Sequence, residues 1–501
     1  MDPLRDAATR DATAPALAGP SAETGEDVSW SWVELDREAD AAALRLAGAG
    51  VGAGDLVAMV LPPSPEAVAL LHAVPRAGGI LVPLHTGWTD EELRRAMAGV
   101  GRPRLLLAPS HRVPALRRVL RPLGIIPVAE ITGHGLPPED GTTVRPALPE
   151  LATDTPLALL LTSGTTGSPR PVPLTHGNLM ASAHGVAERL RLDPMDRWLA
   201  SLAPAHVGGL ALLHRAAVVG SEVILRERFR AEEFLALAAD GRITHASLVP
   251  VMLRRVVDAA GSAPAPRALR CLLLGGAATP PKLLQEALQA RWPVALTYGL
   301  TEASSQVATA PPEAVRRKPG SVGRPLSGVG VAIRTPDPST PGEILVRGPT
   351  VALLSPVPPG GPGDGRTSPS VRLDAEGWLH TGDLGTFDED GELRVTGRLS
   401  DRIVSGGVTV EPGEVEAVLL GHPGVGDAVV IGVPDPDWGE RIVAFVQPMV
   451  RDEPPSPEAL AEYASGRLSS SKRPRRFILV DTLPRTVTGK IDRAALRAHT
   501  G

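Results

Sequence analysis

Several residue types are scarce in this chain of 501 residues, and each scarcity narrows what the protein can be. A single cysteine, Cys271, excludes a disulfide framework within the chain and indicates a reducing compartment, so we expect a cytoplasmic location. The apolar neighbours of Cys271 predict a buried strand residue and not a nucleophile. The net charge of −5 gives no reason to expect nucleic acid or an acidic membrane as a partner.

Long uninterrupted hydrophobic runs are also missing. The most apolar region, residues 207–225, contains His214, Arg215 and Glu222, so it does not predict a membrane span. The first twenty residues carry charges but no apolar core, which excludes a signal peptide. We expect residues 1–27 to form a mobile leader rich in alanine and proline.

Lysine and tyrosine are rare enough to be informative. Among the 51 basic residues, the lysines are Lys282, Lys318, Lys472 and Lys490. The tyrosines are Tyr298 and Tyr463. Arginine is therefore the default cation of this chain, and a lysine or tyrosine inside a motif indicates a specific chemical requirement.

The predicted elements follow one another as α/β units. Strands over 55–61 and 80–84 flank a helix over 66–77, and this spacing indicates a parallel sheet. Ser31 and Glu34 have capping-box spacing and predict a helix over 31–49. A second α/β run spans 222–297, short strands over 320–390 predict a β-rich subdomain, and a last small unit begins near Gly397. At this length, two or more domains are expected.

A loop rich in glycine and hydroxyl residues follows a predicted buried strand over 157–161. Its residues are Thr162, Ser163, Gly164, Thr165, Thr166 and Gly167. Glycines let the backbone approach a ligand, and hydroxyls with free N–H groups form a concave site for anions. The loop predicts phosphate binding, although an ordinary connection has the same composition. The loop does not match the P-loop, because no Lys-Ser or Lys-Thr pair follows Gly167. The glycines near residue 50 do not match the dinucleotide motif either, because their spacing is wrong.

A second motif, Tyr298-Gly299-Leu300-Thr301-Glu302, ends a predicted strand. The tyrosine ring can stack on a purine, the threonine hydroxyl can bind a phosphate, and the glutamate can bind Mg²⁺ through oxygen. The alternative is a simple strand-to-turn junction with an exposed carboxylate.

Upstream of that motif, Gly275-Gly276-Ala277 provides a flat backbone surface for the other side of an adenine ring. A third motif contains Asp383, whose carboxylate can accept both hydrogen bonds of a ribose diol. Arg398, fifteen residues later, could hold the same sugar. An aspartate in a turn is usually only a turn former, and its pairing with Arg398 favours the functional interpretation.

Lys490, preceded by Thr488 and Gly489, is the fourth candidate. Its ammonium group could bridge a substrate carboxylate and an α-phosphate as negative charge builds there, whereas the ordinary alternative is a solvated side chain. Lys472 supports a similar but weaker hypothesis, with a coenzyme phosphate as its ligand.

With Pro169, Leu174, Thr175, His176 and Asn178 behind the first loop, these motifs resemble those of the acyl-adenylate-forming, AMP-binding enzymes. The resemblance covers about residues 30–497. It implies an α/β fold whose large N-terminal domain, residues 1–397, has two α/β subdomains plus a distorted β-barrel. A small mobile α+β domain, residues 398–501, would carry the catalytic lysine.

The resemblance also implies a two-step reaction, in which a carboxylic acid and Mg·ATP form an acyl-adenylate and coenzyme A then takes the acyl group. The loop at 162–167 would hold the leaving phosphates, Thr166 and Glu302 would bind the metal, and the small domain would rotate near Ser400. The implied catalytic residues are Lys490, Thr301, Glu302 and His206.

Finer similarity, at 206–212, 244–250 and 301–307, is to the o-succinylbenzoate–CoA ligase subfamily of menaquinone synthesis. By that likeness, His206 and Ser305 would line the acyl pocket. Arg170-Pro171 replaces the usual Lys-Gly, and Val408-Thr409 replaces the usual Glu-Asn.

Three alternatives remain open on the sequence alone. They are a ligase for another aryl or fatty acid, an enzyme that loads an amino acid onto a carrier protein, and a nucleotide-binding homologue without catalysis. Residues 205–208 lack the aspartate that amino-acid-loading enzymes usually place there. A homo-oligomer is also left open.

Overall fold

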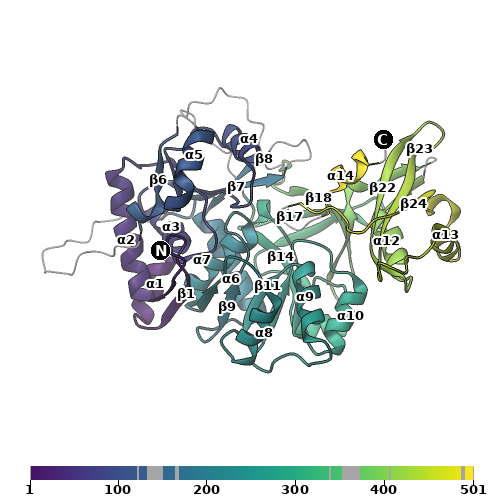
Figure 1. Ribbon diagram of the computed structural model, residues 1–501, viewed down its shortest axis with the longest axis horizontal. Helices are drawn as coiled ribbons and strands as arrows, with labels where there is room; N and C mark the ends of the chain where they lie inside the picture. The colour runs from purple at the N-terminus through teal and green to yellow at the C-terminus, as the bar shows by residue number, and fades with distance from the viewer. Residues whose placement is uncertain are drawn as a thin grey trace, which may run out of the picture.

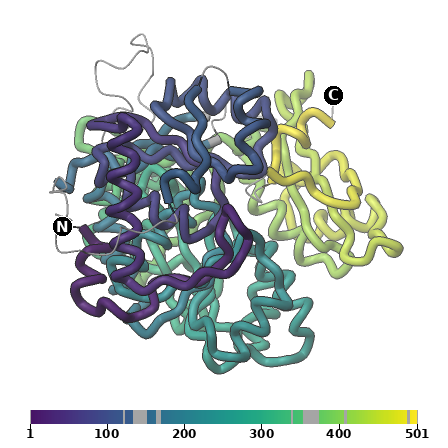
Figure 2. Tube along the Cα trace, turned by 60° about the vertical axis from the view of Figure 1, so that its left-hand side comes forward, coloured from purple at the N-terminus to yellow at the C-terminus, as the bar shows by residue number. Residues whose placement is uncertain are grey.

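The computed structural model describes residues 2–120, 123–132, 151–163, 169–337, 340–352, 373–405, 408–486 and 491–499. Figure 1 shows a large body that contains the N-terminus and a smaller C-terminal unit at one end, coloured light green to yellow. The tube in Figure 2 shows the same separation from a second direction.

The first layer of the large body is a six-stranded sheet in the order β6-β5-β3-β4-β7-β8. The neighbours from β6 to β7 are parallel, whereas β7 and β8 form an antiparallel pair. Its strands are β3 (Leu56–Met59), β4 (Ile80–Pro83), β5 (Leu105–Ala108), β6 (Ile125–Pro127), β7 (Pro156–Ser163) and β8 (Pro169–Thr175). The helices between these strands are α3 (Pro65–Arg76), α4 (Asp90–Val100) and α5 (Val113–Val119). The predicted parallel α/β layer is confirmed.

The second layer is a nine-stranded sheet in the order β15-β14-β13-β12-β11-β9-β10-β1-β2. Its later strands are β9 (Arg197–Ala200), β10 (Glu222–Leu225), β11 (His245–Leu248), β12 (Cys271–Leu274), β13 (Val294–Leu300), β14 (Ser305–Ala310) and β15 (Arg324–Pro325). Its helices are α6 (His176–Leu190), α7 (Val207–Val219), α8 (Ala231–Ala239), α9 (Pro250–Ala260), α10 (Pro281–Gln289) and α11 (Pro312–Arg317). Cys271 is buried in β12, as predicted.

The apolar region at 207–225 forms α7 and β10 in the interior of the large body. A helix that is apolar on every side must be covered on every side, and α7 packs against both α6 and α1. Within the described residues, no helix combines the length and the apolar character needed to cross a membrane.

The prediction of a mobile leader over residues 1–27 is wrong. This segment forms α1 (Pro3–Arg10), β1 (Pro15–Pro20) and the first part of β2 (Asp27–Ser31). Strand β1 lies between β10 and β2, and the side chains of Leu4 and Leu17 are fully buried. The Ala/Pro-rich composition gave no local signal for a strand that is stabilised by pairing with β2 and with β10, the latter about two hundred residues later in the chain.

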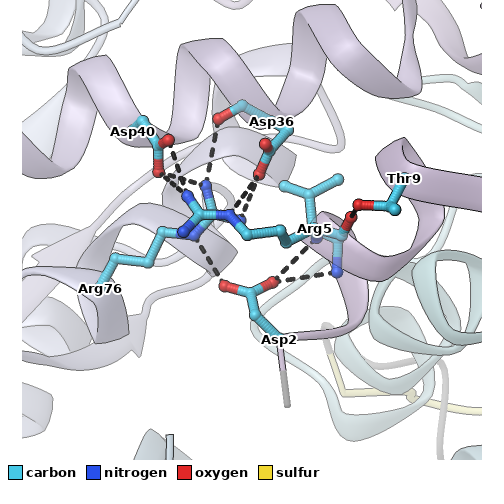
Figure 3. Close-up of polar contacts among 7 residues, drawn as sticks. Asp2, Arg5, Thr9, Asp36, Asp40 and Arg76 are labelled. Atoms are coloured by element: carbon cyan, nitrogen blue, oxygen red, sulfur yellow. Dashed lines mark hydrogen bonds and ion pairs between the residues drawn. The ribbon is translucent and has the colours of Figure 1, made fainter. Parts of the chain in front are cut away.

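Charged side chains attach α1 to the helices behind it, as Figure 3 shows. The guanidinium of Arg76, on α3, donates to Asp36 at 2.6 Å, to Asp40 at 2.8 Å and to Asp2 at 2.8 Å. Arg5 donates to both oxygens of Asp40 at 2.7 Å. Burial raises the pKa of Asp2, but the hydrogen bond and charge of Arg76 outweigh it, so the pKa is lowered overall. This network joins α1, α2 (Trp32–Gly48) and α3.

A four-stranded antiparallel sheet, in the order β16-β17-β18-β19, forms the β-rich subdomain predicted over 320–390. Its strands are β16 (Gly330–Arg334), β17 (Gly342–Arg347), β18 (Leu379–Phe387) and β19 (Leu393–Arg398). The C-terminal unit has its own sheet and two small apolar cores. Its elements are β20 (Ile403–Ser405), β21 (Val408–Val410), α12 (Pro412–Leu420), β22 (Val425–Asp435), β23 (Gly439–Pro448), α13 (Pro457–Ser465), β24 (Arg476–Leu479) and α14 (Arg493–Ala498).

Candidate active site

Three residues that the sequence assigned to one nucleotide lie together beside the carboxyl end of β13. Tyr298, on β13, donates its phenolic hydrogen to Oδ2 of Asp383 on β18 at 2.8 Å. Arg398, the last residue of β19, forms an ion pair with Oδ1 of Asp383 at 2.7 Å. Asp383 and Arg398 are directly opposite each other across the β18–β19 ladder, so the register of the sheet sets their contact.

Burial and charge act together in this cluster. Tyr298 is 8% exposed and Asp383 is 4% exposed, whereas the Arg398 side chain is 56% exposed. Burial, and then the negative charge of Asp383, raise the pKa of the Tyr298 phenol, which therefore stays protonated and donates. The charge of Asp383 raises the pKa of Arg398, with smaller contributions from other groups that include Glu302. The arrangement fixes the ring of Tyr298 and leaves a guanidinium facing solvent.

A tight turn follows Tyr298 and positions Thr301 and Glu302. A Cβ on Gly299 would lie 1.7 Å from the carbonyl oxygen of Ser305, so only glycine fits there. Thr301–Ala303 form a 3-10 helix, and Ser304 and Ser305 have φ of 54° and 101°. Such left-handed conformations cost about 1–3 kcal/mol each and gather at functional sites.

Side chains of α6 and the backbone of residues 349–352 stabilise this turn. Ser182, on α6, donates to the carbonyl of Ser304 at 2.7 Å, and the Ala352 N–H donates to the carbonyl of Glu302 at 2.9 Å. Asn178 donates to the carbonyls of Pro349 and Val351 and so holds the same segment against α6. Ser182 was not predicted, because nothing in the sequence distinguishes it from any other small residue on a buried helical face.

The segment Gly275-Gly276-Ala277 leaves β12, the neighbour of β13, at the same edge of the sheet. Gly276 and Ala277 are exposed, and Gly276 has φ of 79°, a conformation that favours glycine. A Cβ on Gly275 would lie 2.9 Å from the methyl group of Thr297. The structure thus places an open backbone surface beside the strand that carries Tyr298.

The two residues assigned to the acyl pocket lie on neighbouring elements. His206 is the N-cap residue of α7, and Ser305 begins β14, against which α7 packs. Gly209 is required here because a Cβ would lie 2.3 Å from the Ala203 carbonyl. The ring of His85, which follows β4, lies 5.3 Å from that of His206, and burial lowers the pKa of His85. His85 was not predicted, because it belongs to none of the sequence motifs.

Of the loop predicted to bind phosphate, only Thr162 and Ser163 lie within the described residues. Strands β7 and β8 pair up to Ser163 and Pro169, and the hydroxyl of Thr162 donates to the Arg170 carbonyl at 3.3 Å. The remaining loop residues and the proposed catalytic lysine lie outside the described residues. These are Gly164, Thr165, Thr166, Gly167 and Lys490.

In the C-terminal unit, the structure locates two further candidates. Ser400 lies in a 3-10 helix, Leu399–Asp401, that connects β19 to β20. Its neighbour Asp401 pairs with Arg493 at 3.2 Å. The ammonium of Lys472 donates to both oxygens of Glu414 on α12, at 2.8 and 2.7 Å. Lys472 would have to leave this carboxylate to bind a coenzyme phosphate.

Comparison with known families gives two adjacent matches. The pattern of the AMP-binding enzyme family matches residues 4–354, and that of the AMP-binding enzyme C-terminal domain matches residues 414–490.

Individual relatives cover almost the whole chain. A 2-succinylbenzoate–CoA ligase from Bacillus licheniformis is 37% identical over 451 residues, which is 88% of this chain and 89% of that protein. The ligase of the same name from Geobacillus kaustophilus is 37% identical over 450 residues, 89% of this chain and 88% of its own. The o-succinylbenzoate CoA synthetase of Bacillus subtilis, solved with its acyl-adenylate intermediate, superimposes with a TM-score of 0.85 at 32% identity, covering 99% and 98% of the two chains.

Proposed function

Because the chain belongs to the family of AMP-binding enzymes, we propose that it is an ATP-dependent acid–CoA ligase whose acid is 2-succinylbenzoate. The observation that carries the proposal is the Tyr298–Asp383–Arg398 cluster, because it presents an aromatic ring, a carboxylate and a guanidinium at one edge of the sheet. The ring suits an adenine, and the carboxylate and guanidinium together suit the ribose of ATP.

A free carboxylate is a poor electrophile, since its leaving group would be oxide. In the first step, a carboxylate oxygen attacks the α-phosphorus of ATP, the α–β bridging bond breaks, and pyrophosphate leaves. In the second step, the coenzyme A thiol loses its proton, attacks the acyl carbon and releases AMP. The acyl group thus reaches sulfur through an intermediate with a good leaving group.

The residues of this chain supply binding and charge for both steps. Asp383 and Arg398 hold the ribose, while Tyr298 and the backbone at 275–277 enclose the adenine. Glu302 would offer a carboxylate oxygen, the kind of ligand that Mg²⁺ prefers, and it lies in the turn that directly follows Tyr298. The loop at 162–167 holds the leaving phosphates, with Thr166 as the second metal ligand, and Thr301 binds phosphate.

We assign the remaining roles by position. His206 and Ser305 line the space for the acid, and the pairing of His206 with His85 orients the imidazole. Lys490 offsets the charge that develops between the acid and the α-phosphate. The unit from residue 398 rotates near Ser400 after the first step, and Lys472 then meets a coenzyme phosphate. All three substrates are small molecules, and a cytoplasmic enzyme would meet ATP and coenzyme A directly.

A substrate panel tests the proposal. The purified protein is given Mg·ATP, coenzyme A and one acid at a time, namely 2-succinylbenzoate, benzoate, fatty acids or amino acids, and thioester formation and ATP–pyrophosphate exchange are measured. We expect both activities with 2-succinylbenzoate. Thioester formation only with another acid would reassign the substrate, and nucleotide binding without exchange with any acid would support a non-catalytic homologue.

A further inference from the structure

A cavity of about 410 Å³ opens at the edge of the nine-stranded sheet, where β14 and β15 meet α6 and α11. Cavities of about 300–1,000 Å³ are the usual size for small-molecule sites. Its charged lining residues are Arg189, Arg191, Arg317, Arg324, Glu313 and Glu392. Four guanidinium groups therefore face two carboxylates across one depression.

Three of these arginines are available to a ligand. Arg191, Arg317 and Arg324 are exposed, and none of the three forms an ion pair with a carboxylate in the described part of the chain. The fourth, Arg189, donates to the Pro325 carbonyl at 2.7 Å and is thereby fixed against β15. Guanidinium groups bind phosphate oxygens with paired N–H donors, so this rim is suited to a phosphate.

A buried carboxylate in the cavity needs a donor. Glu392 is 7% exposed, and its Oε2 atom is buried without a hydrogen-bond donor among the described residues. A buried polar atom without a partner is unfavourable, and a donor brought by a ligand would offset that cost. A hydroxyl group beside a phosphate would supply that donor.

The cavity is separate from the candidate active site. Glu392 precedes β19 and Arg398 ends it, so a strand of about 3.3 Å per residue separates the two by roughly 20 Å. Strand β14 begins at Ser305 and reaches the cavity at Thr309, whose neighbour Ala308 pairs with Tyr298. The cavity is thus distant from Arg398 and Ser305 along these two strands, but close to the backbone of Tyr298.

We propose that this cavity binds a small organic phosphate that carries hydroxyl groups, such as a sugar phosphate. The arginine rim holds the phosphate, and Oε2 of Glu392 accepts a hydrogen bond from a hydroxyl. This site is additional to the ATP site and does not depend on the proposed ligase activity.

Isothermal titration of the full chain with fructose 1,6-bisphosphate, glucose 6-phosphate, ribose 5-phosphate and inorganic phosphate tests the proposal. We expect saturable one-to-one binding of at least one sugar phosphate. Arg317→Ala and Arg324→Ala should each weaken it about tenfold or more, since a hydrogen bond to a charged group contributes about 1.5–3 kcal/mol. Arg316→Ala is the matched control, because Arg316 is exposed on the same helix but does not line the cavity.

Two further variants locate the ligand. Glu392→Ala should weaken the sugar phosphate more than inorganic phosphate, and Arg398→Ala should leave both affinities unchanged. The proposal is overturned if no sugar phosphate binds saturably, if Arg316→Ala weakens binding as much as Arg317→Ala, or if Arg398→Ala abolishes it. Thermal unfolding of each variant checks that the fold is retained.

Discussion

Tyr298 and Asp383 are 85 residues apart in the chain, yet the phenolic hydroxyl of one donates to the carboxylate of the other at 2.8 Å. Their contact joins the nine-stranded sheet to the four-stranded sheet at the proposed nucleotide site. The aromatic ring and the carboxylate proposed to bind the ribose are thus held as one unit before any nucleotide arrives.

The first prediction separates the ring of Tyr298 from its hydroxyl. Tyr298→Phe keeps the stacking surface but removes the hydrogen bond to Asp383. Losing one hydrogen bond of about 1 kcal/mol should raise the KM for ATP about fivefold. Asp383→Ala also leaves Arg398 without its partner and should raise KM far more. ATP–pyrophosphate exchange at varied ATP measures both effects, and equal values for wild type and Asp383→Ala would contradict the ribose assignment.

Lys490 should matter for adenylation alone. Lys490→Ala should slow ATP–pyrophosphate exchange by about 10²–10³-fold, the usual effect of removing one preorganised donor. Thioester formation from supplied acyl-adenylate should continue. Lys282→Ala is the control, because Lys282 is exposed on α10. An unchanged exchange rate in Lys490→Ala would show that another group stabilises the transition state.

Gly299 should not tolerate a side chain. In Gly299→Ala the added methyl would overlap the Ser305 carbonyl, so the turn that positions Thr301 and Glu302 must move. We expect exchange activity to fall at least 100-fold, since small misplacements of reacting groups have effects of that size. Gly466→Ala is the control, because a Cβ there meets nothing within 4 Å. Circular dichroism separates loss of activity from loss of fold.

Removing Arg76 should destabilise the N-terminal segment. Arg76→Met leaves the carboxylates of Asp2, Asp36 and Asp40 near one another without their shared cation, at a cost of about 3–5 kcal/mol. Arg94→Met, which breaks an exposed pair with Glu91, should leave the unfolding midpoint almost unchanged, because water screens exposed pairs. Urea unfolding compares the two, and similar midpoints would argue against the network as a stabilising feature.

Stability should fall in mild acid because of buried histidine. Burial lowers the pKa of His72 to about 4, whereas the unfolded chain has a pKa of about 6.5. Between these values the unfolded state binds a proton that the folded state does not. The free energy of unfolding should therefore decrease as pH falls through that window, by up to about 1.4 kcal/mol per pH unit.

His72→Leu tests the assignment, because it should reduce the number of protons taken up on unfolding by about one and so lower that slope. His184→Asn, at an exposed position on α6, should leave the slope unchanged. His214, whose ring lies 6.5 Å from that of His72 and whose pKa burial also lowers, should contribute to the remaining slope, as should His245. Identical slopes for wild type and His72→Leu would place the acid sensitivity elsewhere.

Elements with local signals were predictable from the sequence. The helix predicted over 66–77 and the strand predicted over 80–84 agree with α3 and β4 to within one residue, and the Ser31–Glu34 capping box is present. The helix α7 was not predicted, because a run that is apolar on every side has no period to read. The strand β1 was missed because its stabilisation comes from a distant partner.

The candidate site was predictable as a set of residues but not as a geometry. Motif spacing placed Tyr298, Asp383 and Arg398 with one ligand, and the structure brings these three together. The hydrogen bond from Ser182 and the ring contact of His85 depend on how α6 and α7 pack, which no local pattern encodes. The sequence alone therefore identified the candidate site residues but not the residues that hold them in position.

The pairing of β1 with β10 has a consequence for how the chain is made. Leu17 pairs with Val223, so the edge of β1 that faces away from β2 has no partner until β10, about 200 residues later, has been synthesised. At about 5–20 residues per second, that wait lasts roughly 10–40 seconds. During synthesis, an apolar strand edge is thus open to water and to other chains until the middle of the protein emerges.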